Sequence, residues 1–201
     1  MIKKILLLSL IFCGLFFRGY SQTGYEKSIL PAEKESISLF GLKSNLLYDL
    51  TASLNLGIEY RMSEYLTIDA SINYNPWTFS NNRKYKHILI QPELRYWIYE
   101  PFNGHFFGGH LLYSRYNVGN LPFGSLKDFR YNGDAYGVGI SYGYQWLLSP
   151  RWNLEATLGI GYIYFDYTRY ECRTCGEELG RGNKNYLGPT KAGISLIYIL
   201  K

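Results

Sequence analysis

The chain has 201 residues, of which 21 are Lys or Arg and 16 are Asp or Glu, so its formal net charge is +5. Three basic residues lie within the first 21, and the rest of the chain has 18 basic and 16 acidic side chains, a net charge of +2. This balance excludes a strongly basic nucleic-acid-binding domain. The 21 tyrosines, with 11 Phe and four Trp, are typical of a protein with many side chains at an apolar–polar boundary.

The N-terminus has the features of a secretory signal peptide. Lys3 and Lys4 precede an apolar run over residues 5–17, and the small residues Gly19 and Ser21 suit a cleavage site before Gln22. The apolar run is about 13 residues long, shorter than the roughly 20 that a membrane-spanning helix needs. We therefore expect an exported protein rather than a helical membrane anchor.

Apolar and polar residues then alternate along the chain with the period of two that β-strands produce. From Ser53 to Met62 every second residue is apolar, and the residues between them are polar or small. Such a strand has one hydrocarbon face and one polar face. The same pattern predicts eight strands, near residues 40–50, 53–62, 65–75, 87–99, 105–117, 134–147, 152–167 and 188–200.

The predicted connections alternate in length. Short links follow the second, fourth and sixth strands, at residues 63–64, 100–104 and 148–151. Long links follow the third, fifth and seventh strands, at residues 76–86, 118–133 and 168–187. All long loops therefore lie on one rim, an asymmetry typical of bacterial outer-membrane barrels.

Alternation alone does not show which face of the sheet contacts water. A secreted lipocalin-like barrel, with its apolar residues inside, is therefore the alternative. Aromatic residues lie near the ends of the apolar strand faces, as in the two aromatic girdles of a membrane barrel. We therefore predict an all-β fold, an eight-stranded antiparallel up-and-down transmembrane β-barrel. The predicted organisation is a signal peptide at 1–21, a periplasmic lead-in at 22–38 and an outer-membrane β-barrel at 39–201.

The inward face of this predicted barrel contains charges of both signs in similar numbers. They are Lys43, Asp49, Glu59, Arg61, Asp69, Glu93, Arg95, Glu155 and Lys191. An eight-stranded barrel is only wide enough to be filled by its own side chains. We expect these charges to form a polar network that holds the barrel, rather than a pore lining or a catalytic site.

Several motifs resemble an uncharacterised family of Bacteroidetes outer-membrane β-barrels. They include Lys43-Ser-Asn-Leu-Leu-Tyr-Asp, Tyr74-Asn-Pro-Trp77, Gln91-Pro-Glu-Leu-Arg-Tyr-Trp97, Trp152-Asn-Leu-Glu155 and Cys172-x-x-Cys175-Gly. The resemblance covers the whole mature chain and implies a barrel in the outer membrane. Because genes of this kind often lie near fimbrial or surface-polymer genes, it also implies a part in surface assembly or adhesion.

Cys172 and Cys175 lie in the longest predicted loop. In an exported protein, two cysteines at this spacing most simply form a local disulfide. Reduced thiols and a metal site are the alternatives. A zinc site needs about four ligands, and no histidine is nearby in sequence, so we predict no metal and no cofactor.

The long-loop rim combines basic and aromatic residues. The candidate binding residues are Trp77, Arg83, Lys84, Tyr85, Arg130 and Tyr131. Aromatic stacking and charged hydrogen bonds suit an acidic sugar or a protein partner. Contact with anionic lipid headgroups is the alternative use of these cations.

These features predict a structural, adhesive or surface-assembly role, with outer-membrane lipid and a fimbrial or other surface protein or glycan as partners. A second hypothesis is a membrane-lipid-modifying enzyme, a hydrolase or acyltransferase, because His110 and Ser114 lie on one face of a predicted strand. A narrow pore is the third. No nucleic-acid partner is expected.

Overall fold

The computed structural model describes residues 39–79, 83–122, 124–171 and 176–200. These residues form strands, one short α-helix and one 3₁₀ turn. The elements are β1 (Phe40–Asn45), α2 (Leu46–Leu50), β2 (Leu54–Arg61), β3 (Leu66–Asn75), β4 (Thr78–Phe79), β5 (Arg83–Trp97), β6 (Gly104–Gly119), η2 (Gly124–Lys127), β7 (Phe129–Leu147), β8 (Trp152–Glu171) and β9 (Glu178–Leu200). No helix in these ranges is long and apolar enough to cross a membrane.

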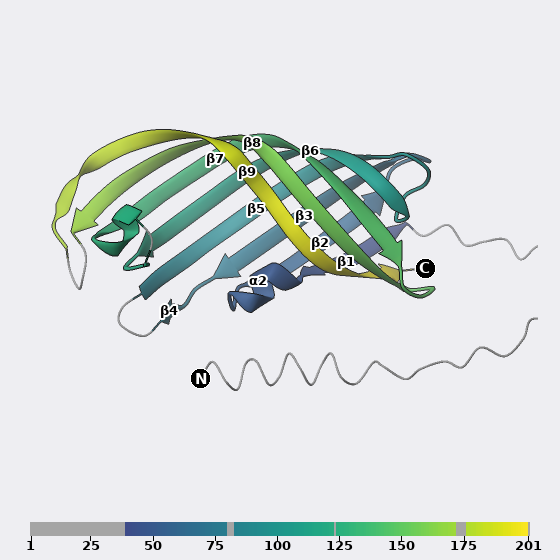
Figure 1. Ribbon diagram of the computed structural model, residues 1–201, viewed down its shortest axis with the longest axis horizontal. Coiled ribbons are helices and arrows are strands. Elements are labelled where there is room, and N and C mark those ends of the chain that lie inside the picture. The colour runs from purple at the N-terminus through teal and green to yellow at the C-terminus, as the bar shows by residue number, and fades with distance from the viewer. Residues whose placement is uncertain (1–38, 80–82, 123, 172–175, 201) are drawn as a thin grey trace, which may run out of the picture. The chain divides into compact units, whose positions relative to one another are not determined.

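The strands form one antiparallel up-and-down sheet that closes on itself. Their order is β3-β2-β1-β9-β8-β7-β6-β5-β4, and β3 also pairs with β5. This last pairing runs from Leu66↔Tyr96 to Asn75↔His87 and completes a ring-like sheet (Figure 1). The two-residue strand β4 is not needed for closure, because it pairs only with the start of β5.

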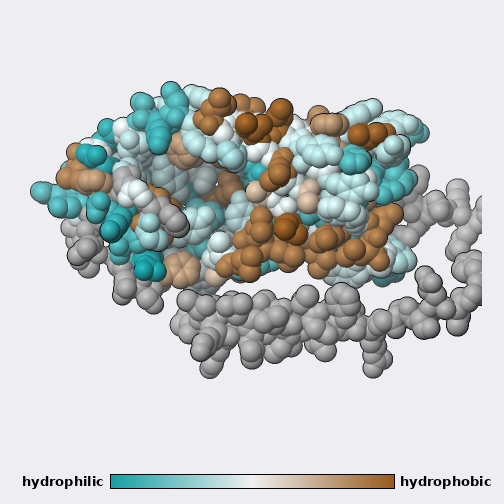
Figure 2. All heavy atoms as spheres, viewed as in Figure 1, coloured by the Kyte–Doolittle hydropathy of each residue, from teal (hydrophilic) through white to brown (hydrophobic). Residues whose placement is uncertain are grey.

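The ring carries apolar side chains outside and polar side chains inside. On β2, for example, Ile58 is 48% exposed whereas Glu59 is fully buried. Exposed apolar side chains of the outer face, which we call the apolar belt, include Leu54, Ile58, Leu111, Val138, Ile140, Leu158 and Ile160. Figure 2 shows apolar side chains gathered over part of the visible surface and hydrophilic ones at the end farthest from the C-terminus. This distribution is the reverse of that in a water-soluble domain.

The first predicted strand is shorter than expected, because residues 46–50 form the helix α2 instead of continuing it. The Asn45 side chain accepts a hydrogen bond from the Leu47 backbone N–H at 3.1 Å. Asparagine is a preferred helix cap because it satisfies a free backbone N–H in this way. The alternation over residues 40–50 therefore predicted a longer strand than the one observed, Phe40–Asn45.

The long links are also shorter than predicted, because β5 to β9 continue well beyond the ends of β1, β2 and β3. We call these continuations the extension: residues 83–87, 114–119, 129–135, 163–171 and 178–187 (Figure 1). Their backbones keep the antiparallel ladder, for instance at Tyr131↔Arg169. Alternation predicted only the first residues of these continuations and missed 83–86, 118–119, 129–133, 168–171 and 178–187, because polar and aromatic residues occur on both faces there.

The register of the predicted strand 105–117 is regular. Ile90↔Tyr113 and Glu93↔His110 belong to the same register, so the bulge considered for this strand is absent. The pairing lapses only beside Pro92, which has no backbone N–H to donate. A register shift occurs instead between β8 and β9, at Gly159/Ile160.

Candidate functional site

Charged side chains from six strands meet inside the ring. Three cations and four carboxylates form what we call the charged layer: Lys43, Glu59, Asp69, Glu93, Arg95, Glu155 and Lys191. Six of the seven are buried, and the side chain of Lys191 is 11% exposed. They converge because each faces inward on its own strand.

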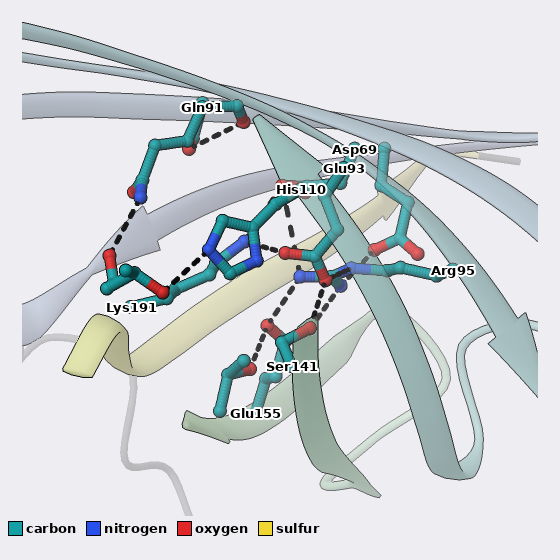
Figure 3. A network of polar contacts seen from close by, with 12 residues as sticks. Asp69, Gln91, Glu93, Arg95, His110, Ser141, Glu155 and Lys191 are labelled. Atoms are coloured by element: carbon teal, nitrogen blue, oxygen red, sulfur yellow. Dashed lines mark hydrogen bonds and ion pairs between the residues drawn. The ribbon is translucent and has the colours of Figure 1, made fainter. Parts of the chain in front are cut away.

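Arg95 is at the centre of the charged layer (Figure 3). Its Nε donates to Glu93 Oε1 at 2.9 Å, and its Nη1 donates to Glu59 Oε2 at 3.0 Å. Nη1 and Nη2 together bind the two carboxylate oxygens of Glu155, at 2.8 and 3.1 Å. A planar guanidinium suits this role because it presents several donors in fixed directions.

The two lysines connect the remaining carboxylates. Lys43 Nζ lies 3.0 Å from Asp69 Oδ2, 3.0 Å from Glu155 Oε2 and in contact with Glu59. Lys191 contacts Glu93 and lies 3.8 Å from Asp69 Oδ1. Asp69 Oδ2 makes no hydrogen bond to another described residue, although Lys43 is within ion-pair distance.

Neutral donors complete the shell around these carboxylates. Thr67 donates to Glu59, Thr157 Oγ1 donates to Glu155 Oε1 at 2.8 Å, and Ser141 Oγ donates to Glu93 Oε1 at 3.0 Å. Trp97 Nε1 in turn donates to Thr67 Oγ1 at 2.9 Å. Thr67 and Ser141 were not among the predicted site residues, although each occupies the polar face of its predicted strand.

Two of the nine residues predicted for this network lie elsewhere. Asp49 is on α2, where its carboxylate accepts hydrogen bonds from Ser44 at 3.2 Å and Asn55 at 2.8 Å. Arg61 ends β2, and its Nε donates to the Ser63 carbonyl at 3.2 Å. The helix removes Asp49 from the inward strand face, and Arg61 is too near the rim to reach the charged layer.

Apolar clusters lie on both sides of the charged layer. At the short-link end, Phe102, Ile197 and Ile199 form one buried cluster. The Arg95 guanidinium lies over the Phe106 ring next to it, 4.3 Å from the centroid. Toward the extension, the second cluster contains Leu89, Leu112, Ala135 and Ile163, with Tyr48, Tyr116 and Phe165 packed against it.

The histidine considered for catalysis is buried and does not meet the predicted serine. His110 Nε2 lies 2.9 Å from Thr190 Oγ1, and its Nδ1 has no hydrogen-bond partner among the described residues. Ser114 is four residues farther along β6, roughly 13 Å away at the rise of a strand. Activation of a serine requires hydrogen-bond contact with its base, so this pair is not assembled.

A small polar cavity lies beside the charged layer. Its volume is about 40 Å³ and its lining includes Asn73, Gln91, Lys191 and Tyr48. A space of this size holds about three water molecules. No group of three or more His, Cys, Asp or Glu side chains in the described ranges is arranged to hold a metal ion.

Nearly the whole chain matches one protein family. Residues 24–200 match the family described as Protein of unknown function (DUF3575). The chain belongs to this family. A search of the curated proteins found no match. The predicted resemblance is thus confirmed as far as an uncharacterised family of unknown function, while the Bacteroidetes and outer-membrane assignments stay predictions.

The rim residues predicted as one binding patch are divided in this DUF3575 member. Strand alternation puts Arg83, Tyr85 and Tyr131 on the inner face of the extension, and Lys84 and Arg130 on its outer face. The remaining candidate, Trp77, follows β3, and its Nε1 donates to the Ala52 carbonyl at 2.9 Å. The prediction treated these positions as a flexible loop, in which neighbours share a surface, whereas neighbours on a strand do not.

The two candidate disulfide residues, Cys172 and Cys175, lie outside the described residues. Their predicted bond is therefore still a prediction. The described strands β8 and β9 flank this segment, with Tyr170↔Glu178 as their last pair.

Proposed function

We propose that this protein is an eight-stranded outer-membrane β-barrel with a structural or adhesive role, exercised by the extension outside the cell. The observation that carries the proposal is the reversal of polarity across the ring wall. Leu158 and Ile140 are 71% and 68% exposed on the outer face, while Glu59 and Arg95 are buried inside. Such a wall suits a hydrocarbon solvent outside, because an apolar belt of this extent in water is unfavourable.

The height of the apolar belt supports the same proposal. On β8 the outward residues from Trp152 to Tyr162 include Leu154, Leu158 and Ile160. Ten residues of a strand tilted by about 40° rise roughly 25 Å, which is the height of the apolar band in known outer-membrane barrels.

Aromatic side chains at the two ends of the belt add further support. Trp146 and Trp152 lie near the short-link end, and Tyr136 and Tyr162 lie near the extension. Amphipathic rings favour the boundary between hydrocarbon and water. The proposed membrane boundaries are therefore at these two levels.

The interior favours a structural or binding role over transport or catalysis. The charged layer fills the ring with paired side chains, and the apolar clusters lie on either side of it. His110 contacts Thr190 rather than a serine nucleophile. The extension offers the largest surface outside the proposed membrane, so the partner, a surface protein or a glycan, is expected there.

Cell fractionation combined with gel mobility tests the membrane assignment. The full chain should appear in the outer-membrane fraction and migrate faster on a denaturing gel before boiling than after it, because a closed barrel resists unfolding in detergent. Recovery in the soluble periplasmic fraction would contradict the proposal. For the adhesive role, cells lacking the gene should lose surface-fibre assembly or adhesion, and unchanged surface behaviour would contradict that part.

A further inference from the structure

The inner face of the extension is rich in aromatic rings. Six inward-facing rings there come from β5, β6, β7 and β8: Tyr85, Tyr116, Phe129, Tyr131, Phe165 and Tyr167. Tyr186 on β9, opposite Ile163, adds a further ring. Several are in contact, with centroids 5.9 Å apart for Tyr116 and Phe165 and 5.2 Å apart for Tyr131 and Tyr167. All six are partly exposed, so ring surface is left for a ligand.

Two glycines let neighbouring groups approach closely on this surface. Gly133 faces inward between Tyr131 and Ala135 on β7. Gly182 on β9 faces Tyr167, and a Cβ atom there would lie 3.2 Å from the Tyr167 hydroxyl. Figure 2 shows a hollow in this part of the molecule. The inner face is therefore hollowed, and its rings are partly exposed.

The phenol groups on this face are available as donors. The hydroxyls of Tyr85, Tyr116, Tyr131 and Tyr167 make no hydrogen bond to another described residue, unlike Tyr113 on the outer face, whose hydroxyl donates to Asp134 at 2.9 Å. A tyrosine presents a ring face for stacking and a hydroxyl for hydrogen bonding. Sugars require this combination, because each has an apolar C–H face and a rim of hydroxyls.

Basic side chains face inward on the same strands as these rings or on the neighbouring strand β9. Arg83, Arg169 and Lys184 face inward and are exposed, and the Arg169 guanidinium lies over the Phe129 ring, 4.9 Å from its centroid. The acidic residues Asp134 and Asp166, on the same part of the strands, point to the opposite face, whereas Glu171 faces inward opposite Phe129. Among the described residues, three cations against this one carboxylate leave the inner face with a positive balance. The inner face therefore favours a ligand with negative charge.

We propose that the inner face of the extension binds an acidic oligosaccharide. The tyrosine rings stack on the sugar faces, their hydroxyls bond to the sugar hydroxyls, and Arg169, Lys184 and Arg83 bind the carboxylates. Arginine suits carboxylates because it binds both oxygens. The inference rests on the proposed function, to which it adds the chemical class of the partner.

Calorimetric titration of the full chain in detergent micelles tests the inference with defined probes. Hexagalacturonate, with six carboxylates, is expected to bind with a Kd below about 1 mM. Neutral maltohexaose should bind at least tenfold more weakly, because it lacks the charges. Hexaglutamate should also bind at least tenfold more weakly, because it lacks sugar faces. No binding of hexagalacturonate at millimolar concentration, or equal binding of either other probe, would overturn the inference.

Substitutions locate the site. The double variant Arg169→Gln/Lys184→Gln should weaken hexagalacturonate binding at least tenfold and leave maltohexaose unaffected. Tyr131→Ala should weaken both saccharides, and Tyr131→Phe, which keeps the ring, should retain the larger part of the affinity. The matched control is Arg115→Gln/Arg130→Gln, with the same charge change on the outer face, and should bind normally. An equal loss in this control would place the site elsewhere and overturn the inference.

The outcomes separate this inference from the proposed function. Each variant is first checked for the fold by its gel mobility before and after boiling. A chain that fractionates with the outer membrane but does not bind hexagalacturonate contradicts the saccharide site alone. A chain that binds it but fractionates as a soluble protein contradicts the membrane assignment alone.

Discussion

The five strands β5 to β9 run through both the ring and the extension, but their inward side chains are arranged differently in the two regions. In the ring, inward positions such as Glu93, Arg95 and Glu155 are buried and paired, and outward positions are apolar. In the extension, inward positions such as Tyr131 and Arg169 are partly or fully exposed. The change occurs along single strands. We therefore infer that the solvent outside the wall changes from hydrocarbon to water at this level. The inward side chains change their role at the same level, from stabilising the fold to binding a partner.

The largest expected effect comes from removing the central cation of the charged layer. Arg95→Leu leaves the carboxylates of Glu59, Glu93 and Glu155 with too few donors in a buried space. Breaking a buried ion pair by removing one partner costs about 3–5 kcal/mol. Urea titration in detergent, followed by gel mobility, measures the free energy of unfolding.

The control for this change is Arg61→Leu. Arg61 also lies on the ring, but its guanidinium donates to the Ser63 carbonyl at the rim and makes no ion pair with a described carboxylate of the charged layer. Its loss should change the free energy of unfolding far less. Equal destabilisation by both substitutions would show that the charged layer does not hold the ring.

A charge in the middle of the apolar belt should have the next largest effect. Leu158→Arg places a guanidinium where we expect hydrocarbon, at a cost of about 2–4 kcal/mol at the bilayer midplane. Leu187→Arg, opposite Tyr162 at the proposed interface, should cost about 0–1 kcal/mol. The free energies of unfolding of both variants in lipid vesicles test this, and equal costs would contradict the depth assigned to the belt.

Two glycines on opposite faces of the ring wall, Gly143 inside and Gly109 outside, provide a smaller and more local test. A Cβ on Gly143 would lie 2.3 Å from Phe106 Cζ, whereas one on Gly109 would meet no atom within 4 Å. Overpacking a filled interior costs about 1–3 kcal/mol. We expect Gly143→Ala to lower the thermal midpoint in detergent and Gly109→Ala to leave it nearly unchanged. A similar shift for both would mean that the interior is not filled.

The smallest effect is expected in the exposed ion pair of the extension. Arg115 Nε donates to Asp134 Oδ1 at 3.0 Å and holds the pKa of that carboxyl below its usual range. Because the folded pKa is below the unfolded one, the stabilisation is present above the unfolded pKa and fades as the pH falls through the folded value. Asp134→Asn should reduce the difference in thermal midpoint between pH 7 and pH 3 slightly, and a large reduction would contradict a water-exposed site.

Much of the ring was predictable from the sequence because one physical signal determines it. Leu54 to Arg61 alternates without interruption, since each position meets either the interior or the outer solvent. The inward charges followed from the same alternation, including Lys43, Glu59 and Arg95. Their pairing required the register between strands, which alternation along one strand does not contain.

The extension was less predictable because neither of its faces is purely apolar. Residues 129–133 and 168–171 lack the contrast between inward and outward positions, and they were predicted to be loops. The backbone hydrogen bonds of the extension continue the antiparallel ladder that begins in the ring. The division of Lys84 from Tyr85 and of Arg130 from Tyr131 between two faces follows from this unpredicted strand structure.

The most direct test of the central claim measures the solvent accessibility of a spin label at two positions, one in the apolar belt and one in the extension. Cysteines at Leu158 and, separately, at Lys184, in a Cys172→Ser/Cys175→Ser background, would carry a nitroxide in lipid vesicles. We predict that the label at 158 is relaxed by oxygen and not by a water-soluble nickel chelate, and that the label at 184 is relaxed by the chelate. Equal access of the chelate to both labels would contradict a ring that spans the membrane beneath a water-exposed extension.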